Sequence, residues 1–206
     1  MRACDIRMCV KHGADMIGFV VGYPRPVPWN LNIESAKALM EEAAEPARTC
    51  VVTGGPREKI LLIAMETKPG CLQLHYGESL DDFLYLSNKL NPYGVKIIKT
   101  LFPQTPDLVK TAREFCEAGV YALLFDPRTP DNALNSATAD LSAYNRLKQA
   151  VSCPVFLAGG INPENVSDIL LQTCAPFIDL MTGVESSPGV KDESKVIALF
   201  QAINIA

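Results

Sequence analysis

The chain has 206 residues, 48% of them hydrophobic, which is enough for one substantial core, and we expect a single domain over residues 1–206. The net charge of -4 excludes the basic surface that is typical of nucleic-acid binding and favours a small-molecule ligand. No apolar run approaches the roughly 18 residues that span a membrane, so we expect a cytoplasmic protein without a membrane contact.

Helical and strand patterns alternate along the chain. Amphipathic stretches predict eight helices, at residues 1–11, 32–42, 56–66, 80–90, 105–118 and 141–150, from Pro163 onward, and at residues 193–203. Apolar runs typical of strands buried on both faces predict seven strands, at residues 16–21, 49–53, 71–75, 95–101, 120–126, 155–158 and 177–181. This alternation indicates βαβ units, a parallel sheet and an α/β fold.

The strand count is one short of a closed (β/α)8 TIM barrel, in which each of eight strands precedes its helix. Because the chain begins with a helix, the missing element is the first strand. A seven-stranded remnant would have two unpaired strand edges, which invite aggregation. We therefore expect that Met1 is an internal methionine and that about six to ten further residues form the first strand.

Cysteines are numerous but show no site pattern. The chain has seven of them, an odd number, and none forms a CxxC pair. Neither a disulfide framework nor a metal site is therefore indicated. We expect most of the cysteines to be reduced, buried packing residues.

Glycine-bearing turns follow the last two predicted strands. Gly159 and Gly160 come after the first of these strands, and Thr182 and Gly183 come after the second. In a (β/α)8 barrel the loops after strands seven and eight usually hold a phosphate, with help from a helix N-terminus such as the one predicted at Asn162. We expect a phosphate site here, the alternative being that the glycines only turn the chain.

Polar residues also stand near the carboxyl ends of predicted strands. Asp126 ends the strand at residues 120–126 and should project at the rim where barrel chemistry occurs, with a pKa raised by partial desolvation. The alternative is an aspartate that caps the following turn. Gln73 and His75 alternate with leucines in the strand at residues 71–75 and are expected to line the site. For His75 the alternative is a structural histidine with a backbone partner.

Seven motifs resemble a single family in the right order. They are HGADMIGF (12–19), PRP (24–26), QLH (73–75), LFD (124–126), LAGGINPENV (157–166), TGVE (182–185) and GVKD (189–192). Together they resemble the phosphoribosylanthranilate isomerases of tryptophan biosynthesis. The resemblance implies a cofactor-free (β/α)8 barrel that converts N-(5'-phosphoribosyl)anthranilate to 1-(2-carboxyphenylamino)-1-deoxyribulose 5-phosphate by an Amadori rearrangement.

The resemblance also implies roles for individual residues. Asp126 matches the family's general acid, which protonates the ribose ring oxygen. Arg25 matches an arginine that meets the anthranilate carboxylate, which its guanidinium fork suits, although Tyr23 replaces the usual serine. The alternative for Arg25 is a solvated surface arginine. The family's base is a cysteine in a Lys-x-Cys-Gly segment of the first strand. This sequence lacks that segment, and aligning its HGAD segment with the family places the cysteine in the expected additional residues before Met1. Cys4 and Cys9 fall on the first helix and are expected to be packing residues.

The leading hypothesis is therefore an isomerase that acts on a phosphorylated small molecule, as a monomer or homodimer. Without its base, the chain is alternatively a non-catalytic barrel that binds phosphorylated metabolites. A third possibility is another phosphosugar enzyme, because fold alone does not determine function.

Overall fold

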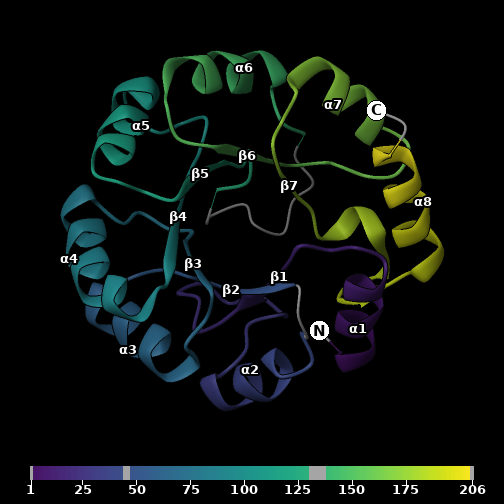
Figure 1. The fold of residues 1–206 in the computed structure, drawn as a ribbon, viewed down its shortest axis with the longest axis horizontal. Helices are drawn as coiled ribbons and strands as arrows, with labels where there is room; N and C mark the ends of the chain where they lie inside the picture. The colour runs from purple at the N-terminus through teal and green to yellow at the C-terminus, as the bar shows by residue number, and fades with distance from the viewer. Residues whose placement is uncertain (1, 44–46, 130–137, 205–206) are drawn as a thin grey trace.

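Parallel strands form one curled sheet, in which neighbours along the chain are also neighbours in space (Figure 1). The structure is a computed structural model, and it describes residues 2–43, 47–129 and 138–204. Within these residues the sheet contains seven strands: β1 (Met16–Val20), β2 (Arg48–Thr53), β3 (Cys71–Leu74), β4 (Lys96–Leu101), β5 (Ala122–Phe125), β6 (Val155–Ala158) and β7 (Ile178–Asp179). The predicted α/β fold with a parallel sheet is thus confirmed, and its described strands form a curled half-barrel.

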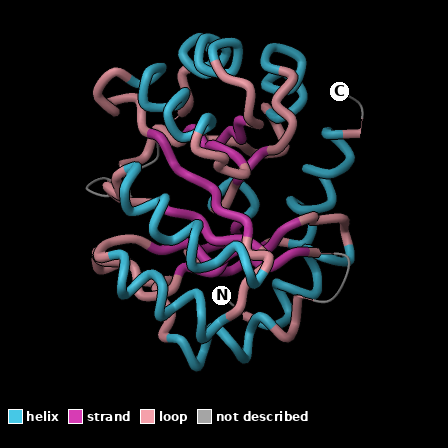
Figure 2. Tube along the Cα trace, turned by 60° about the vertical axis from the view of Figure 1, so that its left-hand side comes forward, coloured by secondary structure: helices cyan, strands magenta, loops and turns pink. Residues whose placement is uncertain are grey.

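Helices surround the sheet, and both views show them outside the strands (Figures 1 and 2). They are α1 (Ala3–Lys11), α2 (Ile33–Met40), α3 (Arg57–Thr67), α4 (Leu80–Leu90), α5 (Leu108–Glu117), α6 (Leu141–Ala150), α7 (Val166–Thr173) and α8 (Glu193–Ile203). Every predicted helix is present, although Met1 of the first one lies outside the described residues. No helix in the described parts of the chain is long and apolar enough to cross a membrane.

The two faces of the sheet bury two separate apolar clusters, because successive side chains of a strand point to opposite faces. The inner cluster fills the concave side and consists of Cys50, Cys71, Ile98, Ala122, Leu124, Phe156 and Ala158. The outer cluster is larger and joins the sheet to the helices, with Phe19, Val51, Leu123 and Leu157 among its strand residues. The residues of a strand that belong to the inner cluster therefore show which side chains at the end of that strand also face the inside.

The last predicted strand and helix differ from the sequence prediction. Helix α7 begins at Val166 rather than Pro163, because Asn162 Oδ1 accepts the amides of Glu164 at 3.0 Å and Asn165 at 3.1 Å and stabilises a separate turn. Strand β7 keeps only two residues of the predicted run 177–181. The chain then forms a 3₁₀ turn, η2 (Thr182–Val184), and an antiparallel hairpin of β8 (Glu185–Ser187) and β9 (Val190–Lys191), which the sequence pattern does not predict.

Within the described residues, the seven-stranded sheet has no pairing between β7 and β1. The free edge of β1 is covered at its carboxyl end by Leu31, whose amide donates to Val20 O at 2.8 Å and whose carbonyl accepts the Gly22 amide at 3.0 Å. On this side of the ring, α1 lies beside α8, where His12 Nε2 is 3.0 Å from Glu193 Oε1 (Figure 1). The first and last helices of the chain therefore lie side by side at the open side of the sheet.

One cysteine pair departs from the expectation of reduced packing residues. Cys116 at the end of α5 and Cys153 before β6 form a disulfide, with their Cα atoms 5.6 Å apart. They are separated by 37 residues along the chain, so no local sequence pattern indicates the pair. The bond joins two neighbouring βα units on the outer side of the sheet.

A buried ion pair joins three segments of the chain on the helix side of the sheet. Lys99 of β4 points toward the helices, and its Nζ lies 3.0 Å from Glu78 Oε2 and 3.2 Å from Tyr76 O. The Glu78 carboxylate also accepts the backbone amides of Gly55 and Tyr76, both at 3.1 Å. Burial lowers the pKa of Lys99, and the Glu78 charge opposes that shift. The pair therefore holds the loops after β2 and β3 against β4.

Replacing Lys99 with methionine should destabilise the fold strongly, because it leaves the buried Glu78 carboxylate without its cation. We expect a loss of roughly 3–5 kcal/mol in the free energy of unfolding, measured by urea denaturation. Lys110→Met is the matched control, since Lys110 forms only an exposed pair with Glu114 and its loss should cost less than about 1 kcal/mol. Equal effects of the two substitutions would contradict the structural role of Lys99.

Candidate active site

A buried carboxylate stands at the carboxyl end of β5. Asp126 follows Phe125 directly and is 0% exposed, and its neighbour Leu124 belongs to the inner cluster, so Asp126 also faces the inside. Arg128 holds it with a guanidinium fork: Nη2 lies 2.9 Å from Asp126 Oδ2 and Nε lies 3.1 Å from Oδ1. The Arg128 amide adds a third hydrogen bond to Oδ1 at 2.8 Å. Asp126 thus caps its own turn and is also part of a charged cluster.

The pKa of Asp126 is shifted in the direction opposite to the one expected from desolvation alone. Burial would raise the pKa of Asp126, but the hydrogen bonds from His75 and Arg128 and the charges of both outweigh it and lower the pKa to about 2. The prediction of a raised pKa is therefore wrong, because it took no account of Arg128 two residues further on. In the free protein Asp126 is ionised at neutral pH.

His75 links Asp126 to the loop that follows β1. Its Nε2 lies 3.4 Å from Asp126 Oδ2, and its Nδ1 lies 3.3 Å from the hydroxyl of Tyr23. The same hydroxyl donates to His75 O at 2.9 Å, and the two rings meet edge to face. Burial raises the pKa of Tyr23, which keeps the hydroxyl protonated as a donor. His75 is thus held on both sides, as a structural histidine would be, while one ring nitrogen faces the Asp126 carboxylate.

The other two predicted ligand residues lie on either side of this cluster. Gln73 is buried and pairs in register with Val52 and Ile98, which both contact the inner cluster, so it faces the inside one layer deeper than His75. Arg25 is exposed, two residues beyond Tyr23, and its positive charge acts on the Tyr23 hydroxyl. Gln73 thus faces the inside as its alternation with leucines predicts, whereas the role of Arg25 remains a prediction.

The two glycine turns lie against each other at the same rim. Gly159 and Gly160 have φ values of 103° and 69°, which favour glycine, and the Gly160 amide donates to no acceptor in the described parts of the chain. Gly183 approaches the other turn so closely that a Cβ at this position would lie 1.9 Å from Ile161 O. Backbone amides in such turns are suited to the oxygens of a phosphate.

Two charged residues of this cluster were not identified from the sequence. Arg128 lies in the turn after Asp126, where a basic residue gives no distinct signal. Asp179 ends β7 and is the register partner of Ala158, a residue of the inner cluster, so its side chain faces the inside. It satisfies the same end-of-strand rule that singled out Asp126. The predicted strand at residues 177–181 had Asp179 at its centre, so only the shorter β7 of the structure places it at a strand end, and nothing in the sequence indicated Arg128.

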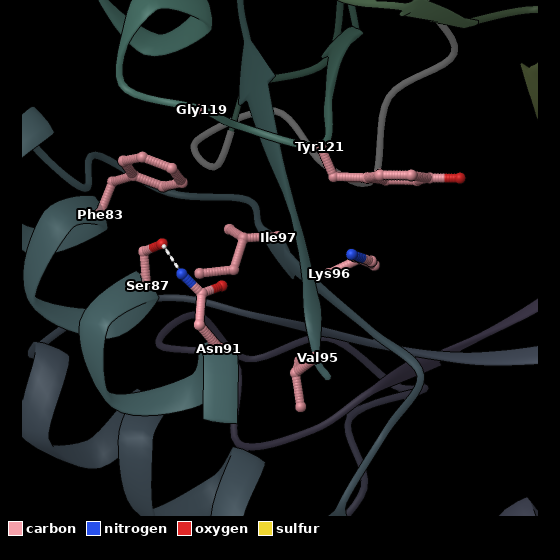
Figure 3. A pocket seen from close by; sticks show the side chains of 8 residues that line it. All are labelled: Phe83, Ser87, Asn91, Val95, Lys96, Ile97, Gly119 and Tyr121. Carbon is pink, nitrogen blue, oxygen red and sulfur yellow. Dashed lines mark hydrogen bonds between the residues drawn. The ribbon is translucent and has the colours of Figure 1, made fainter. Parts of the chain in front are cut away.

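A separate pocket lies at the opposite end of the sheet and does not contact this cluster. It has a volume of about 160 Å³ and is lined by residues near the amino ends of β4 and β5, among them Val95, Lys96 and Tyr121. Figure 3 shows Asn91 of its wall donating to Ser87 Oγ, at 3.2 Å. In barrels of this class the amino ends of the strands serve stability, so we assign the chemistry to the other rim.

Substituting Gly183 with alanine should force the two glycine turns apart, because the new methyl group overlaps the Ile161 carbonyl. We expect a loss of roughly 1–3 kcal/mol in the free energy of unfolding. Binding of inorganic phosphate, measured by calorimetry, should weaken by on the order of tenfold. Gly77→Ala is the control, since nothing lies within 4 Å of a Cβ added there. Unchanged phosphate binding in Gly183→Ala would show that the anion does not use this pair of turns.

Comparison with known proteins agrees with this geometry. The family model described as N-(5'phosphoribosyl)anthranilate (PRA) isomerase matches residues 3–202. The N-(5'-phosphoribosyl)anthranilate isomerase of Rhizobium johnstonii is 31% identical, in an alignment that covers 98% of this chain and 95% of that protein. The phosphoribosyl anthranilate isomerase of Thermus thermophilus superposes with a TM-score of 0.80 at 26% identity, covering 100% of this chain and 95% of the other.

A second solved structure has the same fold. It is a phosphoribosyl anthranilate isomerase in complex with reduced 1-(o-carboxyphenylamino)-1-deoxyribulose 5-phosphate, with a TM-score of 0.80 at 23% identity, covering 100% of this chain and 95% of that one. The family match extends over nearly the whole chain, and it includes the motifs that contain Asp126 and the two glycine turns. The chain belongs to the N-(5'-phosphoribosyl)anthranilate isomerase family.

Proposed function

We infer that this chain isomerises N-(5'-phosphoribosyl)anthranilate to 1-(2-carboxyphenylamino)-1-deoxyribulose 5-phosphate. The observation that carries this inference is the buried Asp126 carboxylate, which faces the inside of the sheet 3.4 Å from His75 Nε2. Such a carboxyl suits a reaction that begins with protonation of a sugar ring oxygen. The family match supports the same substrate.

The substrate has two anionic groups, and the site offers a partner for each. The glycine turns at Gly159 and Gly160 and at Thr182 and Gly183 are suited to its phosphate. Arg25 is suited to its carboxylate, because a guanidinium fork binds a carboxylate with two parallel hydrogen bonds. Gln73 faces the inside of the sheet and His75 contacts Asp126, so both are suited to contact the sugar hydroxyl groups.

Asp126 can donate a proton only after its surroundings change. In the free chain Arg128 stabilises the ionised form. A substrate oxygen that hydrogen-bonds the Arg128 guanidinium would compete with Asp126 for it and weaken the interaction that lowers the pKa of Asp126. Burial then remains and favours the protonated carboxyl. Substrate binding would in this way convert Asp126 into a general acid.

Asp126→Asn should lower kcat for phosphoribosylanthranilate by roughly 10²–10⁴-fold, because an amide cannot protonate the ring oxygen. Affinity for the reduced product, measured by calorimetry, should stay nearly unchanged. Asp15→Asn is the matched control, since Asp15 is exposed and precedes β1 at the opposite end of the sheet.

Two outcomes would contradict these assignments. Wild-type kcat in Asp126→Asn would remove Asp126 from the mechanism. Tight binding of the reduced product by a wild-type chain that does not turn over the substrate would favour the alternative, a non-catalytic barrel for phosphorylated metabolites.

We also propose that a further parallel strand lies between β7 and β1 and completes an eight-stranded barrel. The support is the open pairing edge of β1 below Leu31. Val21 donates its amide to β2, and alternate residues of a strand face alternate edges, so the Gly18 amide faces the open side. Slow hydrogen exchange at Gly18, comparable with that at Phe19, would support the strand, whereas rapid exchange at Gly18 alone would contradict it.

Three broader expectations go with the proposed function. The family's place in tryptophan biosynthesis supports a cytoplasmic location. We propose a single barrel domain over residues 1–206, supported by the family match to residues 3–202. The protein acts as a monomer or homodimer and needs no cofactor, since acid–base groups suffice for the reaction.

A further inference from the structure

The proposed isomerisation needs a proton on Asp126, although this carboxyl is ionised in the free chain. Two side chains among the described residues hydrogen-bond it, Arg128 and His75. Arg128 keeps its protons, because a guanidinium is not deprotonated in proteins. His75 can release one, and its Nε2 lies 3.4 Å from Asp126 Oδ2. Whether it does so depends on its other ring nitrogen, Nδ1, which lies 3.3 Å from the Tyr23 hydroxyl.

The position of Tyr23 is fixed by contacts of its backbone and of its ring. Asn30 holds the backbone twice, since its Oδ1 accepts the Tyr23 amide at 2.9 Å and its Nδ2 donates to Tyr23 O at 3.0 Å. The Tyr23 ring is buried and meets the rings of His75 and Tyr76 edge to face, with centroids 6.0 and 6.3 Å apart. The His75 ring also meets Phe102 edge to face, at 5.6 Å. The hydroxyl of Tyr23 is therefore held against a ring that is itself packed in place.

The hydrogen bonds of the Tyr23 hydroxyl determine which nitrogen of His75 carries a hydrogen. A tyrosine hydroxyl has one hydrogen to donate and lone pairs with which to accept. It donates this hydrogen to His75 O at 2.9 Å, the shorter of its two contacts with this residue. Burial raises the pKa of Tyr23, so the hydrogen is retained. The contact with Nδ1 then uses a lone pair of the hydroxyl oxygen, and Nδ1 is the donor.

A hydrogen on Nδ1 decides what His75 can give at Nε2. With Nδ1 protonated, His75 releases the Nε2 proton and remains a neutral imidazole. With Nδ1 bare, the same release would leave an imidazolate anion. We propose that Tyr23 is a positioning residue of the isomerisation, whose hydroxyl keeps a hydrogen on His75 Nδ1 so that the Nε2 proton can pass to Asp126. This inference rests on the proposed function.

Arg128 determines when the proton moves, because Arg128 and His75 meet the same carboxylate oxygen. Nη2 of Arg128 lies 2.9 Å from Asp126 Oδ2, the atom that His75 Nε2 faces. While the guanidinium stays there, it keeps Oδ2 ionised and the proton stays on Nε2. When a substrate oxygen draws the guanidinium away, the Nε2–H bond breaks and an O–H bond forms at Oδ2. The electron pair of the N–H bond remains on Nε2.

The protons balance over one turnover. Asp126 passes the proton to the ring oxygen as the C1'–O bond breaks, and His75 remains a neutral imidazole with its hydrogen on Nδ1. The proton that the base takes from C2' goes to C1'. When the C2' hydroxyl becomes the ketone, its proton returns through Asp126 to Nε2. The pair ends as it began, as an isomerisation requires.

Nitrogen-15 NMR of ring-labelled histidine measures the position of the hydrogen directly and needs no turnover. The chain has two histidines, so His12→Gln identifies the signals of His75. In the complex of wild type with the reduced product, we expect His75 to be neutral with its hydrogen on Nδ1. In Tyr23→Phe the hydrogen should move to Nε2, because Nδ1 loses its acceptor while Nε2 still faces Asp126.

Kinetics test whether this hydrogen matters for the reaction. Tyr23→Phe keeps the packed ring and should lower kcat by roughly 10–10²-fold, less than loss of the acid itself, because Asp126 remains but must take its proton from water. Affinity for the reduced product should stay within about threefold of wild type. Tyr93→Phe is the matched control, since Tyr93 of η1 (Asn91–Tyr93) is 65% exposed and should keep wild-type kcat.

A double substitution tests whether Tyr23 acts through His75. His75→Gln should lower kcat by a similar factor, because it removes the proton that passes to Asp126. Adding Tyr23→Phe to His75→Gln should then lower kcat by less than about twofold more, since two residues that act in one chain of contacts are not additive.

Each result bears on the inference. A hydrogen on Nε2 alone in the wild-type complex would overturn it without any substitution, and so would wild-type kcat in Tyr23→Phe. Full additivity in the double variant would also overturn it, by showing that Tyr23 acts independently of His75. All three results leave the proposed function intact. A wild-type chain without turnover would instead overturn the proposed function, and the role of Tyr23 with it.

Discussion

The direction of the strands is the constraint on which the rest of the structure depends. All neighbouring pairs from β1 to β7 are parallel, so every strand ends at the same rim. Residues far apart in the sequence, such as His75, Asp126 and Asp179, are therefore brought together by topology alone. The strict alternation of side chains then decides which of them face the inside and which face the helices.

The ion pairs on the two faces of the sheet have different roles. On the helix side, Lys99 and Glu78 are buried and held by several backbone groups, so their ion pair stabilises the loops. On the inner side, Arg128 holds Asp126 from a turn and is itself partly exposed, so an anion can compete for it. One ion pair is therefore structural, while the other is suited to respond to a substrate.

Site residues at strand ends can be predicted from the sequence, whereas contacts made by loops cannot. Asp126, Gln73 and His75 can be predicted from the sequence. Each apolar run shows where its strand ends, and the alternation of side chains along the strand shows which residues face the inside. The contact between Tyr23 and His75 and the fork from Arg128 depend on how two loops fold back over the rim, which periodicity does not encode. The disulfide between Cys116 and Cys153 is equally invisible, since α5 and the segment before β6 become neighbours only in the folded sheet.

The pKa values of Asp126 and Asp179 are shifted in opposite directions, so the two ionised carboxylates have opposite effects on the stability of the fold. Asp126 is nearly fully buried with a pKa of about 2, so its ionised form stabilises the fold by roughly 2 kcal/mol above its unfolded pKa, and that contribution disappears as the pH falls from about 4 to 2. The raised pKa of Asp179 has the reverse effect, and its ionised form weakens the fold at neutral pH. A carboxylate that disfavours the fold and has no hydrogen-bond partner among the described residues is difficult to explain by structure. Side chains at functional sites commonly reduce stability in this way, so the opposite shifts agree with an inner rim that serves binding and chemistry rather than stability.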